Sequence, residues 1–263
     1  MIETLAVLGS WVLFGGTHLL FSWPPVRQWL AGKLGDARFL GIYAAVAAIT
    51  LTLVAVAVAH YGGTGPRGID LGANRVARWI LGALAFIGAA LAAAGIVNYP
   101  SSAMAVLARR MRSSGAARRA PLSAPTAIER VTRHPFFVGL ALLMATHALM
   151  ASTLPSAVFF AGFSLLALIG IPMQDRKLRE RHGQVYGSYE SATSAVPFAT
   201  FRAAPDINFP RQLPVIATAI AGAVLVAILH PVWSLNHGAW FAVLIAIGGL
   251  YGVAKQLWNS RNA

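Results

Sequence analysis

Two histidines stand inside long apolar segments of the sequence, where polar side chains are rare. His18 belongs to the first segment, residues 3–22, and His147 belongs to the fourth, residues 135–152. A polar, ionisable side chain is costly inside a membrane, so it normally has a partner there. Imidazole is a common axial ligand of haem iron. Two imidazoles on two apolar segments, His18 and His147, therefore suggest one partner above others, a haem iron.

The residues beside these histidines suit a flat, apolar cofactor. Gly15 lies about one helical turn before His18 and leaves room beside the imidazole. Met144 precedes His147 by three residues and offers a soft, polarisable surface. We therefore expect Gly15 and Met144 to line the pocket. The alternative for each histidine is a hydrogen bond to a neighbouring helix. Thr17, Ser22 and Thr146 are candidate partners for the second ring nitrogens.

Depth in the membrane leaves the pairing of the histidines open. At 1.5 Å per residue, His18 lies about 6 Å and His147 about 18 Å from the cytoplasmic ends of their segments. An upright haem needs both ligands at one level. His60, at the end of the second apolar segment, and His134, before the fourth, are therefore alternative metal ligands. His134 and the preceding Arg133 are also weaker candidates for catalysis, and we expect them at the membrane interface.

The elements that must position these residues are transmembrane helices. The chain has 263 residues, of which 57% are hydrophobic and only 11% are charged, whereas a soluble domain carries roughly 25% charged residues. Seven segments are apolar over about the length that spans a bilayer. They are residues 3–22, 38–60, 78–99, 135–152, 155–173, 213–230 and 236–256. The sequence therefore predicts an all-α, polytopic bundle with six or seven spans.

Positive charge predicts the orientation of this bundle. The net charge is +13, and 18 of the 21 Lys and Arg residues fall in alternate loops and the C-terminal tail. The remaining three lie in the loop at 61–78. Because basic loops stay on the cytoplasmic side, we expect the N-terminus outside and the C-terminus in the cytoplasm. We expect a multi-pass protein of the bacterial cytoplasmic (inner) membrane that contacts lipid headgroups and does not bind nucleic acid.

Local patterns predict further details of the helices. In the third apolar segment, Gly88 and Ala92 fall four residues apart, a spacing that lets helices approach closely in lipid. The Thr126–Glu129 pattern resembles a capping box, so the fourth helix is expected to begin there.

The basic stretch at 175–182 is expected to form a short surface helix that Gly183 can end. Its i,i+4 spacing pairs Asp175 with Arg179 and Arg176 with Glu180.

Several short motifs, in order, resemble the NnrU family. They are HLLFSWPPVR (18–27), KLG (33–35), Tyr43, RHPFFVG (133–139), ATHAL (145–149), YGSY (186–189), TS (193–194), PF (197–198) and HPVW (230–233). The resemblance covers roughly residues 1–233. Residues 234–263 read as an additional C-terminal transmembrane helix with a short tail.

The NnrU family is similar to 15-cis-zeta-carotene isomerase, a membrane protein with haem b. The resemblance implies axial ligands at the positions of His18 and His147, and reduction of the iron that frees one ligand position for a polyene double bond. It also implies a link to denitrification and nitric-oxide metabolism. The expected ligand is a lipid-soluble or gaseous small molecule. The sequence does not choose between the two chemistries, nor establish that the protein is an enzyme.

A second resemblance is to membrane methyltransferases of the isoprenylcysteine and phospholipid type. It is carried by RHP and Gly139 in residues 133–139 and by RERHGQVYGSY at 179–189. It implies an S-adenosylmethionine site at the membrane surface that includes His134. The chain departs from that pattern at residues 174–175, where Gln-Asp replaces the usual pair of glutamates. A non-catalytic membrane assembly factor is the third alternative.

Overall fold

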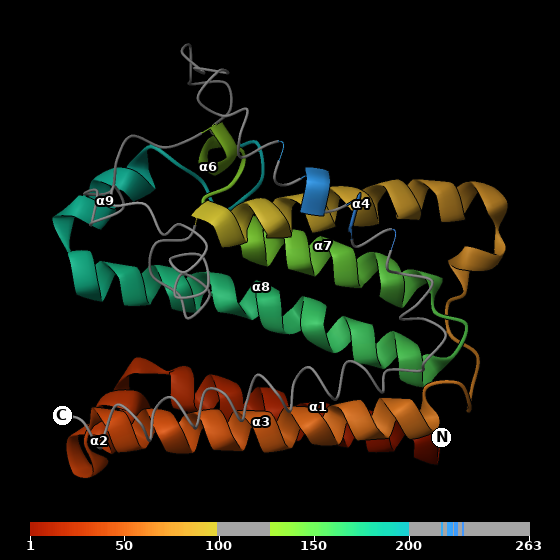
Figure 1. The fold of residues 1–263 in the computed structure, drawn as a ribbon, viewed down its shortest axis with the longest axis horizontal. Helices are drawn as coiled ribbons and strands as arrows, with labels where there is room; N and C mark the ends of the chain where they lie inside the picture. The colour runs from red at the N-terminus through yellow and green to blue at the C-terminus, as the bar shows by residue number, and fades with distance from the viewer. Residues whose placement is uncertain (99–126, 200–216, 218–219, 223, 226–227, 229–263) are drawn as a thin grey trace. The chain divides into compact units, whose positions relative to one another are not determined.

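The computed structural model describes residues 1–98 and 127–199, together with residues 217, 220–222, 224, 225 and 228. Within them the chain forms helices and one isolated β-bridge, between Arg67 and Thr153, which confirms the predicted all-α class. The elements in Figure 1 are α1 (Ile2–Ser22), α2 (Pro24–Leu34), α3 (Asp36–Tyr61), the 3-10 turn η1 (Leu71–Ala73), α4 (Arg75–Asn98), α6 (Ala127–Val131), α7 (Pro135–Met150), α8 (Leu154–His182) and α9 (Gln184–Ser191).

Four of these helices are long and apolar enough to cross a membrane. They are Ile2–Ser22, Asp36–Tyr61, Arg75–Gly95 and Leu154–Glu180, while the apolar α7 has 16 residues. Large apolar side chains such as Val12, Ile49 and Ile87 are exposed on them, as contact with lipid requires. The expected spans at 213–230 and 236–256, and with them the C-terminal extension at 234–263, lie largely or wholly outside the described residues. The protein is therefore a membrane protein whose number of spans and orientation stay predictions.

The chain divides into two compact units. The first comprises Met1–Trp79 and His147–Gly162, and the second comprises Ile80–Thr146 and Phe163–Ile228, with the described residues in each. His18, His60 and His147 belong to the first unit, and His134 belongs to the second.

In the first unit, α1 and α3 run side by side and α2 forms the turn between them (Figure 1). The sequence predicts a loop between the apolar segments 3–22 and 38–60, but the structure has the helix α2 there. Its 11 residues mix apolar and basic side chains and so show no apolar run. Trp23 leaves α1 in an extended conformation, and Pro24 begins α2 at a position that needs no N–H donor. Gly35 has φ of 83°, a value that favours glycine, and it allows α3 to start immediately.

The start of α8 is attached to the end of α3 within the same unit. The carbonyl oxygen of Gly62 accepts hydrogen bonds from the Thr153 hydroxyl and from Ser156 Oγ, the latter at 2.7 Å. Further along α8, Gly162 lies directly against the Trp11 ring, where a Cβ atom would come within 2.3 Å of the indole. These contacts hold the first turns of α8 against α1 and α3.

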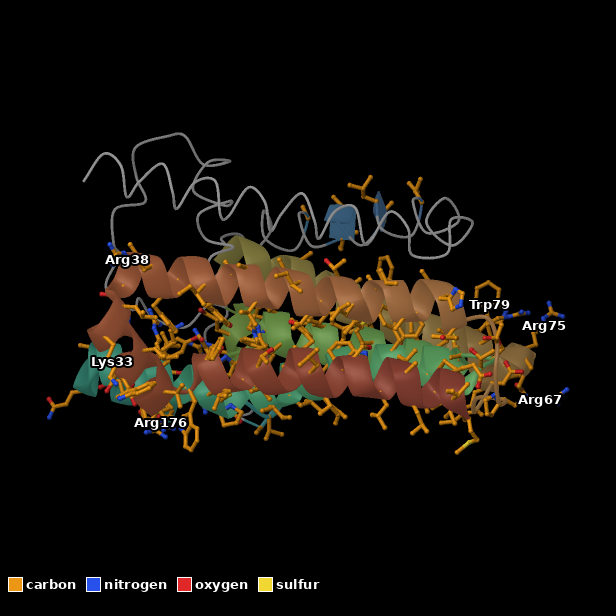
Figure 2. All side chains as sticks on the ribbon, turned by 90° about the horizontal axis from the view of Figure 1, so that it is seen from below. Lys33, Arg38, Arg67, Arg75, Trp79 and Arg176 are labelled. Atoms are coloured by element: carbon orange, nitrogen blue, oxygen red, sulfur yellow. The ribbon has the colours of Figure 1, made fainter. Side chains whose placement is uncertain are left out.

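Basic residues mark both ends of the first unit. Figure 2 shows Lys33 and Arg38 at one end of it and Arg67, Arg75 and Trp79 at the other. The helical length between them is apolar, with a mean hydropathy of 2.4 for α3. This distribution is the one expected of a helix pair whose ends lie at the two surfaces of a bilayer.

In the second unit, α4 and α7 approach so closely that their backbones touch. A Cβ atom on Gly139 would lie 2.3 Å from the amide nitrogen of Ala92, and one on Gly88 would lie 2.7 Å from that of Leu143. The small residues predicted to allow close packing do so, at Gly88 and Ala92. Ser164 Oγ then joins α8 to α7 by donating to the Ala141 carbonyl at 3.0 Å.

Two helix boundaries differ from the prediction. The fourth apolar helix does not begin at Thr126, because residues 132–134 are not helical and separate α6 from α7. Pro135 lacks an N–H group and disfavours a helical conformation at the residue before it. Residues 175–182 are not a separate surface helix, since α8 continues through Pro172 to His182. Gly183, with φ of 53°, ends this helix as predicted.

Candidate functional site

His18 lies in the last turns of α1 and faces a hydroxyl group on α3. Its ring is half-buried, and Tyr43 Oη lies 3.1 Å from Nδ1 and 3.3 Å from Nε2. Tyr43 Oη in turn lies 2.8 Å from Ser22 Oγ. The ring of Phe14, one turn earlier on α1, packs beside the imidazole at 5.4 Å between centroids. The three polar side chains therefore form a chain of hydrogen bonds from Ser22 through Tyr43 to His18.

Aromatic packing fixes the Tyr43 ring that supplies this hydroxyl. Phe39, which is 2% exposed, stacks nearly parallel to it with centroids 6.2 Å apart. Phe21 meets the same ring edge-on at 6.3 Å. Because a rigid ring loses little entropy when it forms a hydrogen bond, this packing prepares the hydroxyl to hold an imidazole.

The two glycines just before His18, Gly15 and Gly16, lie where other described elements make no close approach. A Cβ atom added at Gly15 or at Gly16 would meet none of their atoms within 4 Å. An axial histidine of a haem needs one ring nitrogen for the iron and a hydrogen-bond partner for the other. His18 has a partner in Tyr43 and space beside Gly15, so its surroundings fit the predicted role.

His147 lies in the last turn of α7 and is also half-buried. Its ring packs on Phe160 of α8, with centroids 5.2 Å apart and a tilt of 44°. The neighbouring Met144 is half-buried on the same helix. Of the three suggested hydrogen-bond partners for the histidines, Thr17 and Thr146 instead donate to carbonyls of their own helices. Ser22 reaches His18 only through Tyr43, which the sequence analysis missed as a partner.

The structure places His18 and His147 in one unit but retains the difference in depth between them. Trp11 on α1 packs on Phe159, the residue before the Phe160 that holds His147. Trp11 precedes His18 by seven residues, which is about 10 Å along a helix. The two imidazoles therefore lie at different levels along the helices, and their pairing as ligands of one haem stays a prediction.

The other candidate ligands have different surroundings. His60 is exposed at the end of α3 and meets Tyr61 edge-on at 4.5 Å. Across the part of the chain that the structure describes, no group of three or more His, Asp or Glu side chains is placed to hold a metal ion. Such a group is what zinc usually requires in the absence of cysteine.

His134 is buried in a cluster of charged residues in the second unit. It is 1% exposed, and its Nε2 lies 2.6 Å from Asp175 Oδ1. Tyr186 donates its hydroxyl to the same carboxylate oxygen at 2.5 Å. Arg133 forms two hydrogen bonds to Asp175, of 2.6 Å and 3.1 Å. His134 is therefore buried inside the protein against Asp175, and the expected position of Arg133 and His134 at the membrane interface stays a prediction.

Glu190 extends this cluster to the surface. Arg133 donates to it at 3.1 Å, and Arg179 forms two hydrogen bonds to it of 2.7 Å each. The hydrogen bond from Arg179 is the main reason that the pKa of Glu190 lies below its ordinary value. The predicted pair of Asp175 with Arg179 is wrong, because each has a partner outside the helix. The predicted pair of Arg176 with Glu180 is confirmed at 3.1 Å.

Backbone contacts close the same region. The amide of Arg133 donates to the Ser194 carbonyl at 2.8 Å, and the amide of Phe198 donates to the Val131 carbonyl at 2.8 Å. The charged side chains join residues 133–134 to α8 and α9, and the backbone bonds join residues 131–133 to the segment that follows α9. The arrangement holds two distant parts of the sequence at one place, and its carboxylates and basic groups largely compensate one another.

A comparison with protein families identifies the family of this chain. The model of the NnrU protein family matches residues 6–237, most of the chain. The chain belongs to the NnrU protein family. The match contains His18, His147 and the charge cluster, and it confirms the resemblance found in the sequence motifs.

One relative of known name matches part of the chain. The chain is 35% identical over 74 residues to the chloroplastic 15-cis-zeta-carotene isomerase of Arabidopsis thaliana. This stretch is 28% of the chain and 20% of the isomerase, so the likeness covers a minor part of each protein. No solved structure matches the chain.

Proposed function

We propose that this NnrU-family protein binds haem b in the membrane, with His18 and His147 as axial ligands. The observation that carries the proposal is the environment of His18. An imidazole on an apolar helix has a hydroxyl partner in Tyr43 at 3.1 Å, and no atom of the described residues would crowd a Cβ atom at Gly15. His147 joins it as the second ligand because it belongs to the same unit and is half-buried.

The residues of the chain have separate roles in this proposal. His18 presents one ring nitrogen to the iron while Tyr43 holds the other. Gly15 leaves space for the macrocycle, and Phe14 and Met144 provide apolar surface near the two ligands. The apolar helices keep water away from the site. Bound haem would supply a redox-active iron, and the hydrogen bonds and apolar groups around its histidine ligands would tune that iron.

The reaction we propose is cis-trans isomerisation of a polyene or a related lipid-soluble compound. The support is the similarity to an isomerase named for a carotene and the membrane location of the helices. A gaseous ligand, in chemistry connected with nitric oxide and denitrification, is the alternative for the same haem. The proposed location is the bacterial cytoplasmic membrane, with lipids as the surroundings of the protein.

An absorption spectrum tests the haem proposal. Protein purified in detergent from haem-replete cells is expected to show a Soret band that shifts on reduction with dithionite. His18→Ala and His147→Ala should each remove or alter the band. The exposed His182 provides the control, and His182→Ala should leave the band unchanged. A colourless, folded wild-type protein would rule out haem binding.

Methyl transfer from S-adenosylmethionine is a second candidate, favoured by one observation. The structure brings the Arg133-His134-Pro135 turn together with Tyr186 of the tail, as the methyltransferase resemblance implies. Equilibrium dialysis with labelled S-adenosylmethionine tests it. Saturable binding that His134→Gln removes would support this candidate, and its absence in the wild type would reject it. If the protein binds neither cofactor, a non-catalytic membrane assembly factor is the alternative that remains.

A further inference from the structure

We propose that Tyr43, anchored by Ser22, is the positioning residue for His18 and selects which imidazole nitrogen is presented for ligation. This inference rests on the proposed role of His18 as a haem ligand. It names the group that sets how strongly the His18 imidazole binds the iron. It is carried by the hydrogen-bonded chain from Ser22 to His18, which links α1 to α3 within one unit.

The hydroxyl position leaves a choice between the two ring nitrogens. Tyr43 Oη is 3.1 Å from Nδ1 and 3.3 Å from Nε2 of His18, so it is almost equidistant from them. The torsion that turns a histidine ring is broad. A modest rotation of the ring therefore commits one nitrogen to Tyr43 and leaves the other available to a ligand.

The direction of the hydrogen bonds follows from the donors available. A neutral imidazole has one N–H donor and one acceptor nitrogen. When Tyr43 accepts the N–H of His18, its own O–H donates to Ser22 Oγ, which lies 2.8 Å away. The remaining imidazole nitrogen keeps its lone pair for a metal. A hydrogen-bonded N–H also makes the imidazole a stronger ligand.

Packing makes Tyr43 suitable for a selective test. The Phe39 and Phe21 rings contact the Tyr43 ring and do not depend on its hydroxyl. Tyr43→Phe therefore removes the oxygen and retains the aromatic contacts. Tyr61 supplies a matched control, because it also meets a histidine, His60, on the same helix.

The first readout is haem uptake by the full chain in detergent, titrated with haem b. We expect Tyr43→Phe to weaken binding by about 10-fold or more, the usual effect of losing a partner of a metal-bound histidine. Ser22→Ala should weaken it less and in the same direction, and Tyr61→Phe should match the wild type. Unchanged affinity in Tyr43→Phe would overturn the proposal.

The second readout needs no haem and separates the two proposals. In apo-protein labelled with ¹⁵N-histidine, with His18 assigned through His18→Gln, we expect the His18 ring-nitrogen resonances to shift in Tyr43→Phe. Tyr61→Phe should leave them in place. A wild type that takes up no haem while these resonances shift would defeat the proposed function and still support the positioning role. Resonances that stay unchanged in Tyr43→Phe would defeat the positioning role.

Discussion

Two histidines in this membrane protein have opposite surroundings. His18 is half-buried, faces one neutral hydroxyl, and lies near Gly15 and Gly16, where an added Cβ atom would meet no close neighbour among the described residues. His134 is 1% exposed and is bonded to a carboxylate that two further side chains also bind. The difference separates a histidine that can offer a nitrogen to a ligand from one whose ring is committed to the fold.

This contrast shows that a histidine in a recognisable motif is not for that reason at a binding site. The Arg133-His134 pair has the more conspicuous sequence, but its charges are compensated by Asp175 and Glu190. Within the part of the chain that the structure describes, the hydrogen bonds of the His18 ring go to the neutral Tyr43 hydroxyl. Desolvated charge is stable only when paired, so a buried ion cluster stabilises one conformation rather than receiving an additional ligand.

The largest expected effect comes from breaking the charge cluster. Asp175→Asn leaves Arg133 and His134 without their shared carboxylate, where the side chains of Arg133 and Asp175 are 11% and 6% exposed. Removing one partner of a buried pair costs about 3–5 kcal/mol. Unfolding by denaturant in detergent should show this loss. Arg176→Gln, at the exposed pair with Glu180, is the control and should cost less than about 1 kcal/mol. Equal effects of the two variants would contradict a structural role for the cluster.

A glycine-to-alanine change at the contact between α4 and α7 should cause an intermediate loss of stability. Gly139→Ala forces a Cβ atom to within 2.3 Å of the Ala92 backbone, and overpacking of this kind costs about 1–3 kcal/mol.

Gly15→Ala, at the open site by His18, is the matched change. It should retain stability or gain up to about 1 kcal/mol, since alanine favours helices over glycine. The same unfolding experiment measures both variants. A destabilised Gly15→Ala together with an unchanged Gly139→Ala would reverse the predicted packing.

The smallest expected effect lies at the exposed edge of the cluster. Glu190→Gln removes partly exposed ion pairs with Arg133 and Arg179, so it should cost about 0.2–1 kcal/mol at neutral pH. Because the folded state lowers the pKa of Glu190, the carboxylate stabilises the fold above its unfolded pKa of about 4.3. This stabilisation is lost as the pH falls through the lower, folded pKa.

The wild type and the variant should therefore become closer in stability on strong acidification. Unfolding curves at a series of pH values test this convergence. A difference that grows as the pH falls would contradict the assigned ion pairs.

Local patterns predicted the helices well, whereas long-range partners required the structure. Apolar length identified α1, α3, α4, α7 and α8, because a bilayer requires about 20 apolar residues in a row. The spacing of Gly88 and Ala92 predicted a close helix contact. Spacing along the helix pairs Asp175 with Arg179, whereas two of its actual partners, Arg133 and His134, precede it by 42 and 41 residues. No local rule reaches that far.

The site of His18 illustrates the same limit. Gly15 could be recognised from its position one turn away on the same helix. Tyr43 lies 25 residues after His18, and it meets the histidine only because α2 turns the chain and brings α3 alongside α1. The missed helix and the missed hydrogen-bond partner therefore have one cause.

Chemical rescue of a cavity variant tests most directly whether His18 is a haem ligand. His18→Gly, purified from haem-replete cells, is expected to lose or alter the Soret band of the wild type. Added imidazole should restore that band by occupying the space of the missing side chain beside Tyr43 and Gly15. A wild-type spectrum in His18→Gly without imidazole would contradict ligation by His18. So would a lost band that imidazole fails to restore in a folded protein.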